Sequence, residues 1–140
     1  FKPLSKDDEH HMKSLHVPTT DQQKEFDDQI ASITKILVDS LNEKELEKGL
    51  NISKEKPRGL DKFANFLISN NVNVPKMVKF LRNVQLLRST GVAHRKGTNY
   101  QNAKKFFDFD NKNKIDVFED ILIKCIWMFN TLESNFKLSI

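Results

Sequence analysis

Arg88 and His94 are the two residues of this chain whose types and spacing best suit chemistry on a phosphate group. They lie in the segment NVQLLRSTGVAHRKG, which covers residues 83–97. An arginine carries a permanent positive charge with a planar set of donors, and a histidine exchanges protons near neutral pH. A cation that stabilises a phosphate beside a group that transfers protons is an arrangement suited to phosphodiester cleavage. We therefore take Arg88 and His94 as candidate catalytic residues.

The helix that must position Arg88 is predicted to begin near Pro75. Its apolar residues recur at helical spacing and are expected to face the core: Met77, Phe80, Leu81, Val84 and Leu87. At about 100° per residue, Arg88 lies about 20° from Leu81 around this helix. Its guanidinium must therefore either pair with an acid from another helix or meet an anion in a cleft. Gly91 is the expected C-cap, so His94 can fold back over the last turn.

Basic residues are concentrated around this pair. From Lys76 to Lys105 there are eight Lys and Arg residues and no Asp or Glu, whereas the whole chain carries a net charge of only +4. A block of one sign indicates an anionic partner such as a nucleic-acid backbone, unless acids from elsewhere in the fold neutralise it. Four residues near His94 are candidate RNA contacts: Arg95, Lys96, Tyr100 and Lys104. Tyr100 is included because its side chain can stack on an unpaired base or form a hydrogen bond to one.

The segment LLRSTGVAHR resembles the Arg-x4-6-His motif of the HEPN family, many of whose members are metal-independent ribonucleases. The resemblance implies an all-α, HEPN-like bundle of four to five helices. HEPN domains typically form dimers in which two Arg/His pairs line one cleft, so a homodimer is also expected. One position departs from the family pattern, because Ser89 follows the arginine where HEPN ribonucleases often carry Asn, Asp or His.

The function implied by this resemblance is endoribonuclease activity without a metal or cofactor. His94 would act as general base or acid at the ribose 2′-OH and the leaving 5′-oxygen, while Arg88 would stabilise the charge of the scissile phosphate. Such a domain would be the effector of a larger defence or toxin protein of the bacterial kind. Two alternatives remain open. One is a non-catalytic HEPN-type module that binds RNA or another protein chain, and the other is a helical DNA-binding or oligomerisation domain.

The remaining chain predicts three further helices and a tail. Residues 1–20 are polar, contain two prolines and show no sustained period, so we expect a tail or linker before a helical domain at residues 21–140. Helices are predicted over about 21–41, from Pro57 to about Asn70, and from about 111–115 to Phe136. Residues 106–110 are expected to form an ordered loop over the bundle. Adjacent ligands in the Asp7–His11 stretch make a poor metal cage.

Composition supports a helical protein in a reducing compartment. Hydrophobic residues make up 38% and charged residues 30%, with four Gly and four Pro. The apolar run 121–129 is too short to cross a membrane and contains Lys124, so it predicts core or subunit interface. The single cysteine, Cys125, lies in this run and is expected to be an inert core thiol, which fits the cytoplasm. Because the chain begins at Phe1, we expect a piece of a longer polypeptide or a processed product.

Overall fold

The computed structural model describes residues 1–48, 58–88 and 91–136. Within these ranges every regular element is a helix, which confirms the predicted all-α class. The elements in chain order are α1 (Glu9–Ser14), α2 (Gln23–Thr34), the π-helix η1 (Lys35–Asp39), α3 (Glu43–Leu46), α4 (Gly59–Ser69), α5 (Pro75–Leu87), α6 (Val92–Arg95), α7 (Thr98–Phe106) and α8 (Lys114–Phe136). The expected helix start at Pro57 lies outside the described residues.

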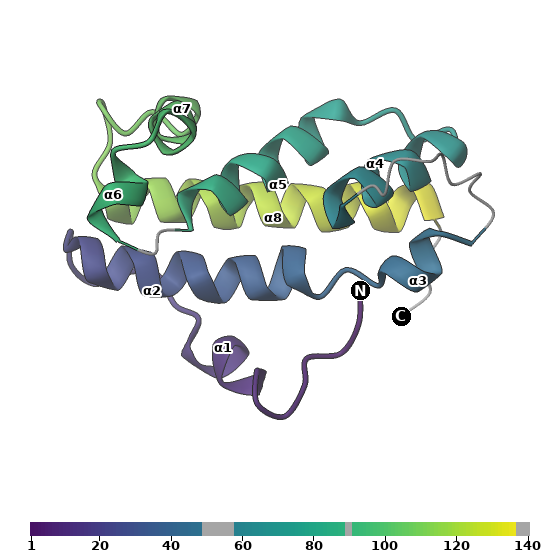
Figure 1. Cartoon of the computed structure of the whole chain (residues 1–140), viewed down its shortest axis with the longest axis horizontal. Helices are drawn as coiled ribbons and strands as arrows, with labels where there is room; N and C mark the ends of the chain where they lie inside the picture. Colours follow the sequence, from purple (N-terminus) through teal and green to yellow (C-terminus); the bar gives the residue numbers. More distant parts are fainter. Residues whose placement is uncertain (49–57, 89–90, 137–140) are drawn as a thin grey trace.

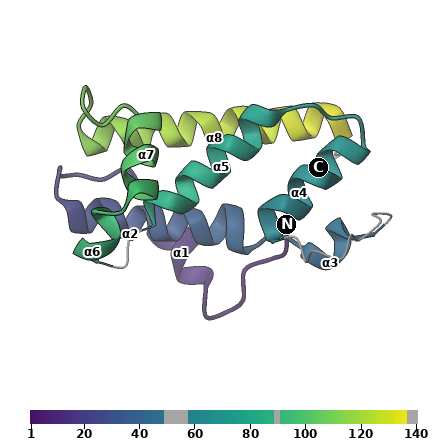
Figure 2. The same cartoon turned by 45° about the horizontal axis from the view of Figure 1, so that its top comes forward.

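The three longest helices, α2, α5 and α8, form the centre of the bundle, and each packs against the other two. Figures 1 and 2 show α2 and α8 running in the same direction, with α5 running the opposite way beside them. All five apolar residues predicted to face inward from α5 are buried. α5 begins at Pro75, as expected for a residue with no backbone N–H to satisfy in a first turn. The core face of α5 therefore fixes where its C-terminal end, and Arg88 with it, must lie.

The N-terminal residues are not the detached tail that the sequence suggested. They form α1, which packs against α2 and η1. Gln29 is buried on α2 and joins the two segments, because it accepts a hydrogen bond from the His16 backbone N–H at 2.8 Å and donates to the Ser14 carbonyl at 3.1 Å. Lys35 of η1 also pairs with Asp8 at 3.3 Å. Polar contacts of this kind leave no hydrophobic period in the sequence, so periodicity alone does not predict how α1 packs.

The connection from α5 to α8 contains two helices, α6 and α7, where the sequence suggested only loops. Gly91 is not the C-cap of α5, which ends at Leu87, but the N-cap of α6. Its φ of 154° and ψ of 179° lie in a region that glycine alone occupies readily. α7 ends at Phe106, and the next residue, Phe107, is buried with its ring edge-on to Phe80 at 6.3 Å. The connection thus covers the bundle with packed helical turns.

α8 divides the apolar run 121–129 between two environments. Ile121, Cys125 and Met128 are buried in the core, as the run predicted. Ile123 and Ile126 lie on the opposite face of the helix and are 63% and 61% exposed. In the part of the chain that the structure describes, no helix is both long enough and apolar enough to span a bilayer.

Candidate active site

Arg88 is the C-cap residue of α5, where an extended backbone conformation ends the helix. Both terminal nitrogens of its guanidinium donate to Oδ2 of Asp39, at 2.8 and 3.2 Å. The structure therefore adopts the first of the two alternatives, a pair with an acid from another helix. The Arg88 side chain is 40% exposed, and a pair this accessible to water contributes only about 0 to 1 kcal/mol to stability. Asp39 thus orients the guanidinium through a contact that contributes little net energy.

His94 lies on α6 and is exposed to solvent. As predicted, it folds back over the end of α5, with Nε2 3.4 Å from the Leu86 carbonyl oxygen. Its ring also meets the ring of Tyr100 at 5.8 Å between centroids, tilted by 71°. When Nε2–H donates to Leu86, Nδ1 is the ring atom that can accept a proton. The two contacts hold the imidazole beside the helix end while leaving it open to solvent.

Arg88 and His94 are thus brought to the same end of α5, but their side chains have different neighbours. Arg88 is directed to Asp39, whereas His94 is directed to Leu86 and Tyr100. Within the described residues, no hydrogen bond links the two side chains directly. A substrate phosphate would have to reach both groups. Ser89, the departure from the HEPN pattern, lies outside the described residues.

His11 is a second histidine near Arg88, and the sequence gave no reason to select it. Its Nδ1 lies 3.1 Å from Ser32 Oγ on α2. Partial burial lowers the pKa of His11, and the charges of His10, Lys35 and Arg88 act in the same direction, while Asp8 opposes them. The lowered pKa favours the neutral form of the His11 imidazole, and the charge of Arg88 contributes to this shift. The docking of α1 places it there.

The ring of Tyr100 is not available for the stacking on a base that the sequence suggested. It is 2% exposed, so its ring offers no open face to a base. Its hydroxyl accepts a hydrogen bond from Gln23 Nε2 at 3.4 Å, and burial raises its pKa. The prediction failed because residues 98–106 form a helix that turns Tyr100 inward, where a loop had been expected. The Tyr100 ring also contacts the His94 ring and helps to hold that imidazole in place.

The other three predicted RNA contacts lie on the surface or near it. Lys96 is exposed just beyond α6. Lys104 on α7 is half-buried, with its ammonium 5.6 Å from the centroid of the Phe109 ring. Arg95 pairs with Asp27 of α2 at 3.1 Å. Lys96 is therefore the cation of this group that is most accessible to a ligand near His94.

The basic block is neutralised only in part. Its three arginines pair with acids from other helices, namely Arg82 with Asp61, Arg88 with Asp39 and Arg95 with Asp27. Its five lysines are Lys76, Lys79, Lys96, Lys104 and Lys105. None of them forms a salt bridge within residues 1–48, 58–88 and 91–136. The lysines, more than the arginines, therefore provide the free positive charge of this surface.

We expect Lys96→Ala to weaken RNA binding and to make the remaining binding less sensitive to salt. Each phosphate contact to a single strand contributes about 0.7 to the slope of log affinity against log salt, so losing one contact should lower that slope by about this amount. Filter binding across a salt series measures both quantities. Lys13→Ala, which replaces an exposed lysine of α1, is the control. Equal salt slopes for the two variants would show that Lys96 does not contact the RNA.

Cys125 is a buried thiol and not a candidate nucleophile. Cys125 is 6% exposed, and burial raises the pKa of its thiol to about 12, so it is not a nucleophile at neutral pH. Among the residues described, no three His, Cys, Asp or Glu side chains are grouped so that they could hold a metal ion.

No family model matches the chain, and no curated protein or solved structure matches it either. The resemblance to HEPN domains therefore depends on the Arg88 to His94 segment and the helices around it.

Proposed function

We propose that this chain is a metal-independent endoribonuclease of the HEPN type, acting in the cytoplasm as the effector domain of a larger defence or toxin protein. The observation that best supports this proposal is that the exposed side chain of His94 and the 40% exposed side chain of Arg88 lie at the same end of α5. Lys96, which has no carboxylate partner among the described residues, lies two positions after His94. These groups provide a proton acceptor, a phosphate ligand and a positive field.

The proposed reaction is attack by the ribose 2′-oxygen on the adjacent phosphorus. His94 Nδ1 accepts the 2′-OH proton as the new O–P bond forms, and the bond to the 5′-oxygen breaks. The 5′-oxygen receives a proton, so the products are a 2′,3′-cyclic phosphate and a 5′-OH. Arg88 exchanges Asp39 for the phosphate and stabilises its developing charge. Water supplies the proton to the 5′-oxygen, because α8, on which the dimer surface is assigned below, packs among the described residues against α2 and α5 and not against the η1, α6 and α7 segments around Arg88 and His94.

A homodimer is part of the proposal, and the exposed face of α8 is the surface we assign to it. Ile123 and Ile126 occupy the centre of this face, and Phe129 at its edge is 45% exposed. Large apolar side chains grouped in this way on a surface helix mark an interaction site. A second copy of the chain can cover such a face symmetrically, since the same patch then meets itself.

The alternative is a non-catalytic HEPN-type module that binds RNA or dimerises without cutting. One observation favours it: Asp39 accepts hydrogen bonds from the guanidinium of Arg88, and no hydrogen bond joins the side chains of Arg88 and His94 within the described residues. In such a module the lysines would bind RNA and the Arg/His pair would serve the fold.

Incubation of the purified protein with mixed single-stranded RNA in the presence of EDTA distinguishes the two. The endoribonuclease should shorten the RNA at an undiminished rate when EDTA is added, because no step uses a metal. RNA that is bound but stays intact, with or without added Mg²⁺, would favour the alternative.

A further inference from the structure

A cavity of about 500 Å³ opens between α5, the end of α7 and α8, away from the Arg88 end of α5. Six residues line it: Lys76, Lys79, Phe80, Phe106, Lys124 and Trp127. At 1.5 Å per residue, Lys79 lies about 14 Å along the α5 axis from Arg88. None of the predicted site residues lines this cavity, so it is a separate feature of the surface.

The cavity is positively charged, because three of its six lining residues are lysines and none is acidic. None of the three forms a salt bridge within the part of the chain that the structure describes. Lys79 instead places its ammonium 5.7 Å from the centroid of the Phe106 ring, and Lys124 lies 6.0 Å from that of Phe107. Such contacts leave the charge open to a stronger anionic partner, such as phosphate.

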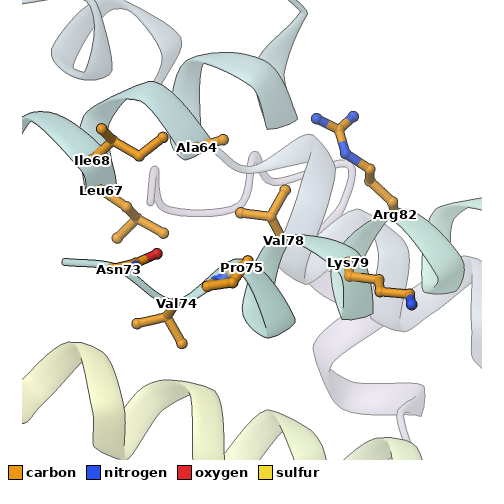
Figure 3. Close-up of a pocket in the computed structure, with 9 residues that line it drawn as sticks. All are labelled: Ala64, Leu67, Ile68, Asn73, Val74, Pro75, Val78, Lys79 and Arg82. Atoms are coloured by element: carbon orange, nitrogen blue, oxygen red, sulfur yellow. The ribbon is translucent and has the colours of Figure 1, made fainter.

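Lys79 separates this cavity from an apolar hollow of about 310 Å³ between α4 and the start of α5. Figure 3 shows the hollow, whose aliphatic wall includes Leu67, Ile68 and Val74, with the Lys79 ammonium directed away from them. Only the cavity on the α7 and α8 side therefore combines this ammonium group with aromatic rings.

Aromatic surface is the second property of the cavity. Trp127 lines the cavity and is 39% exposed, and the Phe106 ring is half-buried. Nucleobases stack on exposed aromatic rings, and lysines beside the rings neutralise the phosphates of the same strand. An apolar ligand would leave the three ammonium groups without a partner, and a simple anion would leave the aromatic rings uncovered. A nucleotide unit uses both.

We propose that this cavity is an accessory site for unpaired nucleotides of the RNA strand, with a base stacked on Trp127 and phosphates bound by Lys79 and Lys124. The inference rests on the proposed function, because it places part of the same substrate. Nine residues at about 100° each also place Lys79 and Arg88 on opposite sides of α5. A stacked strand advances about 3.4 Å per nucleotide, so an RNA that reaches both sites needs more than about four nucleotides between them. Stacking and charge do not read base edges, so binding here tolerates many sequences.

Trp127 is the only tryptophan of the chain, so its fluorescence reports on this cavity directly. We expect a short unstructured RNA to quench it saturably in the His94→Ala variant, which binds RNA without consuming it. The double variant Lys79→Ala, Lys124→Ala should bind at least about tenfold more weakly and show a salt slope lower by about 1.4. Lys13→Ala, an exposed lysine of α1 that does not line the cavity, is the control and should bind as before.

Removal of the Trp127 indole ring tests the same site independently, with RNA affinity measured by filter binding. Trp127→Ala should lower RNA affinity about fivefold to a hundredfold, whereas Trp127→Phe should retain most of it. AMP should quench far more weakly than the RNA, because it supplies one base and one phosphate. Equal quenching by AMP, equal binding of a Glu-rich peptide, or equal RNA affinity of the double variant and the Lys13→Ala control would each overturn the proposal.

The two proposals fail in different ways. If the RNA quenches Trp127 but wild type never cuts it, the accessory site stands and the endoribonuclease does not. If wild type cuts RNA while Trp127 does not respond, the accessory site alone is wrong.

Discussion

Replacement of His94 with alanine is expected to abolish RNA cleavage while leaving the fold and RNA binding nearly unchanged. The side chain is exposed, and its contacts are with the Leu86 carbonyl and the Tyr100 ring, so little packing is lost. Loss of a general acid or base typically lowers a rate by about 10² to 10⁴. Single-turnover cleavage measures this effect, and circular dichroism and filter binding check the fold and the affinity.

Three further variants are compared with His94→Ala. Arg88→Ala should lower both binding and cleavage, because its guanidinium holds the phosphate before and during the reaction. His16→Ala removes an exposed imidazole whose ring contacts only the Val17 carbonyl among the described residues, so it should cleave normally. His11→Ala tests the histidine that lies near Arg88. A change below about threefold in His94→Ala, or a large loss in His11→Ala alone, would contradict the role given to His94.

Replacement of Ile126 with aspartate is expected to convert the homodimer into a folded monomer. Ile126 is 61% exposed, so a carboxylate there meets water in the isolated chain and leaves the core intact. In a dimer the same carboxylate would be buried against an apolar face without a partner, at a cost of several kcal/mol. We therefore expect the dissociation constant to rise by at least about a hundredfold.

Light scattering and thermal unfolding together measure this effect. Met12→Asp is the matched control, since it introduces the same charge at a 57% exposed apolar residue on α1. It should remain dimeric. Wild-type protein that is monomeric at tens of micromolar would contradict the homodimer, and an Ile126→Asp variant that stays dimeric would exclude this face of α8.

The parts of the fold that follow from local periodicity were predictable from the sequence. The inward face of α5 and the extent of α8 are set by apolar residues at helical spacing, and such a pattern predicts both a helix and the side that faces the core. The return of His94 to the end of α5 was also predictable, because a glycine between the two allows the chain to reverse.

The contacts that decide the electrostatics of the site were not predictable in this way. Asp39 meets Arg88 from η1, and Asp27 meets Arg95 from α2, because packing brings distant segments together. The position of His11 depends on α1, which is held by polar contacts with Gln29 and Ser32. A helix such as α7, with few apolar residues, likewise gives a weak period, which is why Tyr100 was placed in a loop.

The most direct test of the proposed endoribonuclease is the end-group chemistry of RNA after incubation with wild-type protein in EDTA. Transfer to the 2′-oxygen predicts fragments that end in a 2′,3′-cyclic phosphate and begin with a 5′-OH, and these fragments should be absent when His94→Ala replaces wild type. RNA that remains intact would contradict the activity. Fragments with a 3′-OH and a 5′-phosphate, or fragments that His94→Ala produces equally well, would contradict the role of the Arg88 and His94 pair.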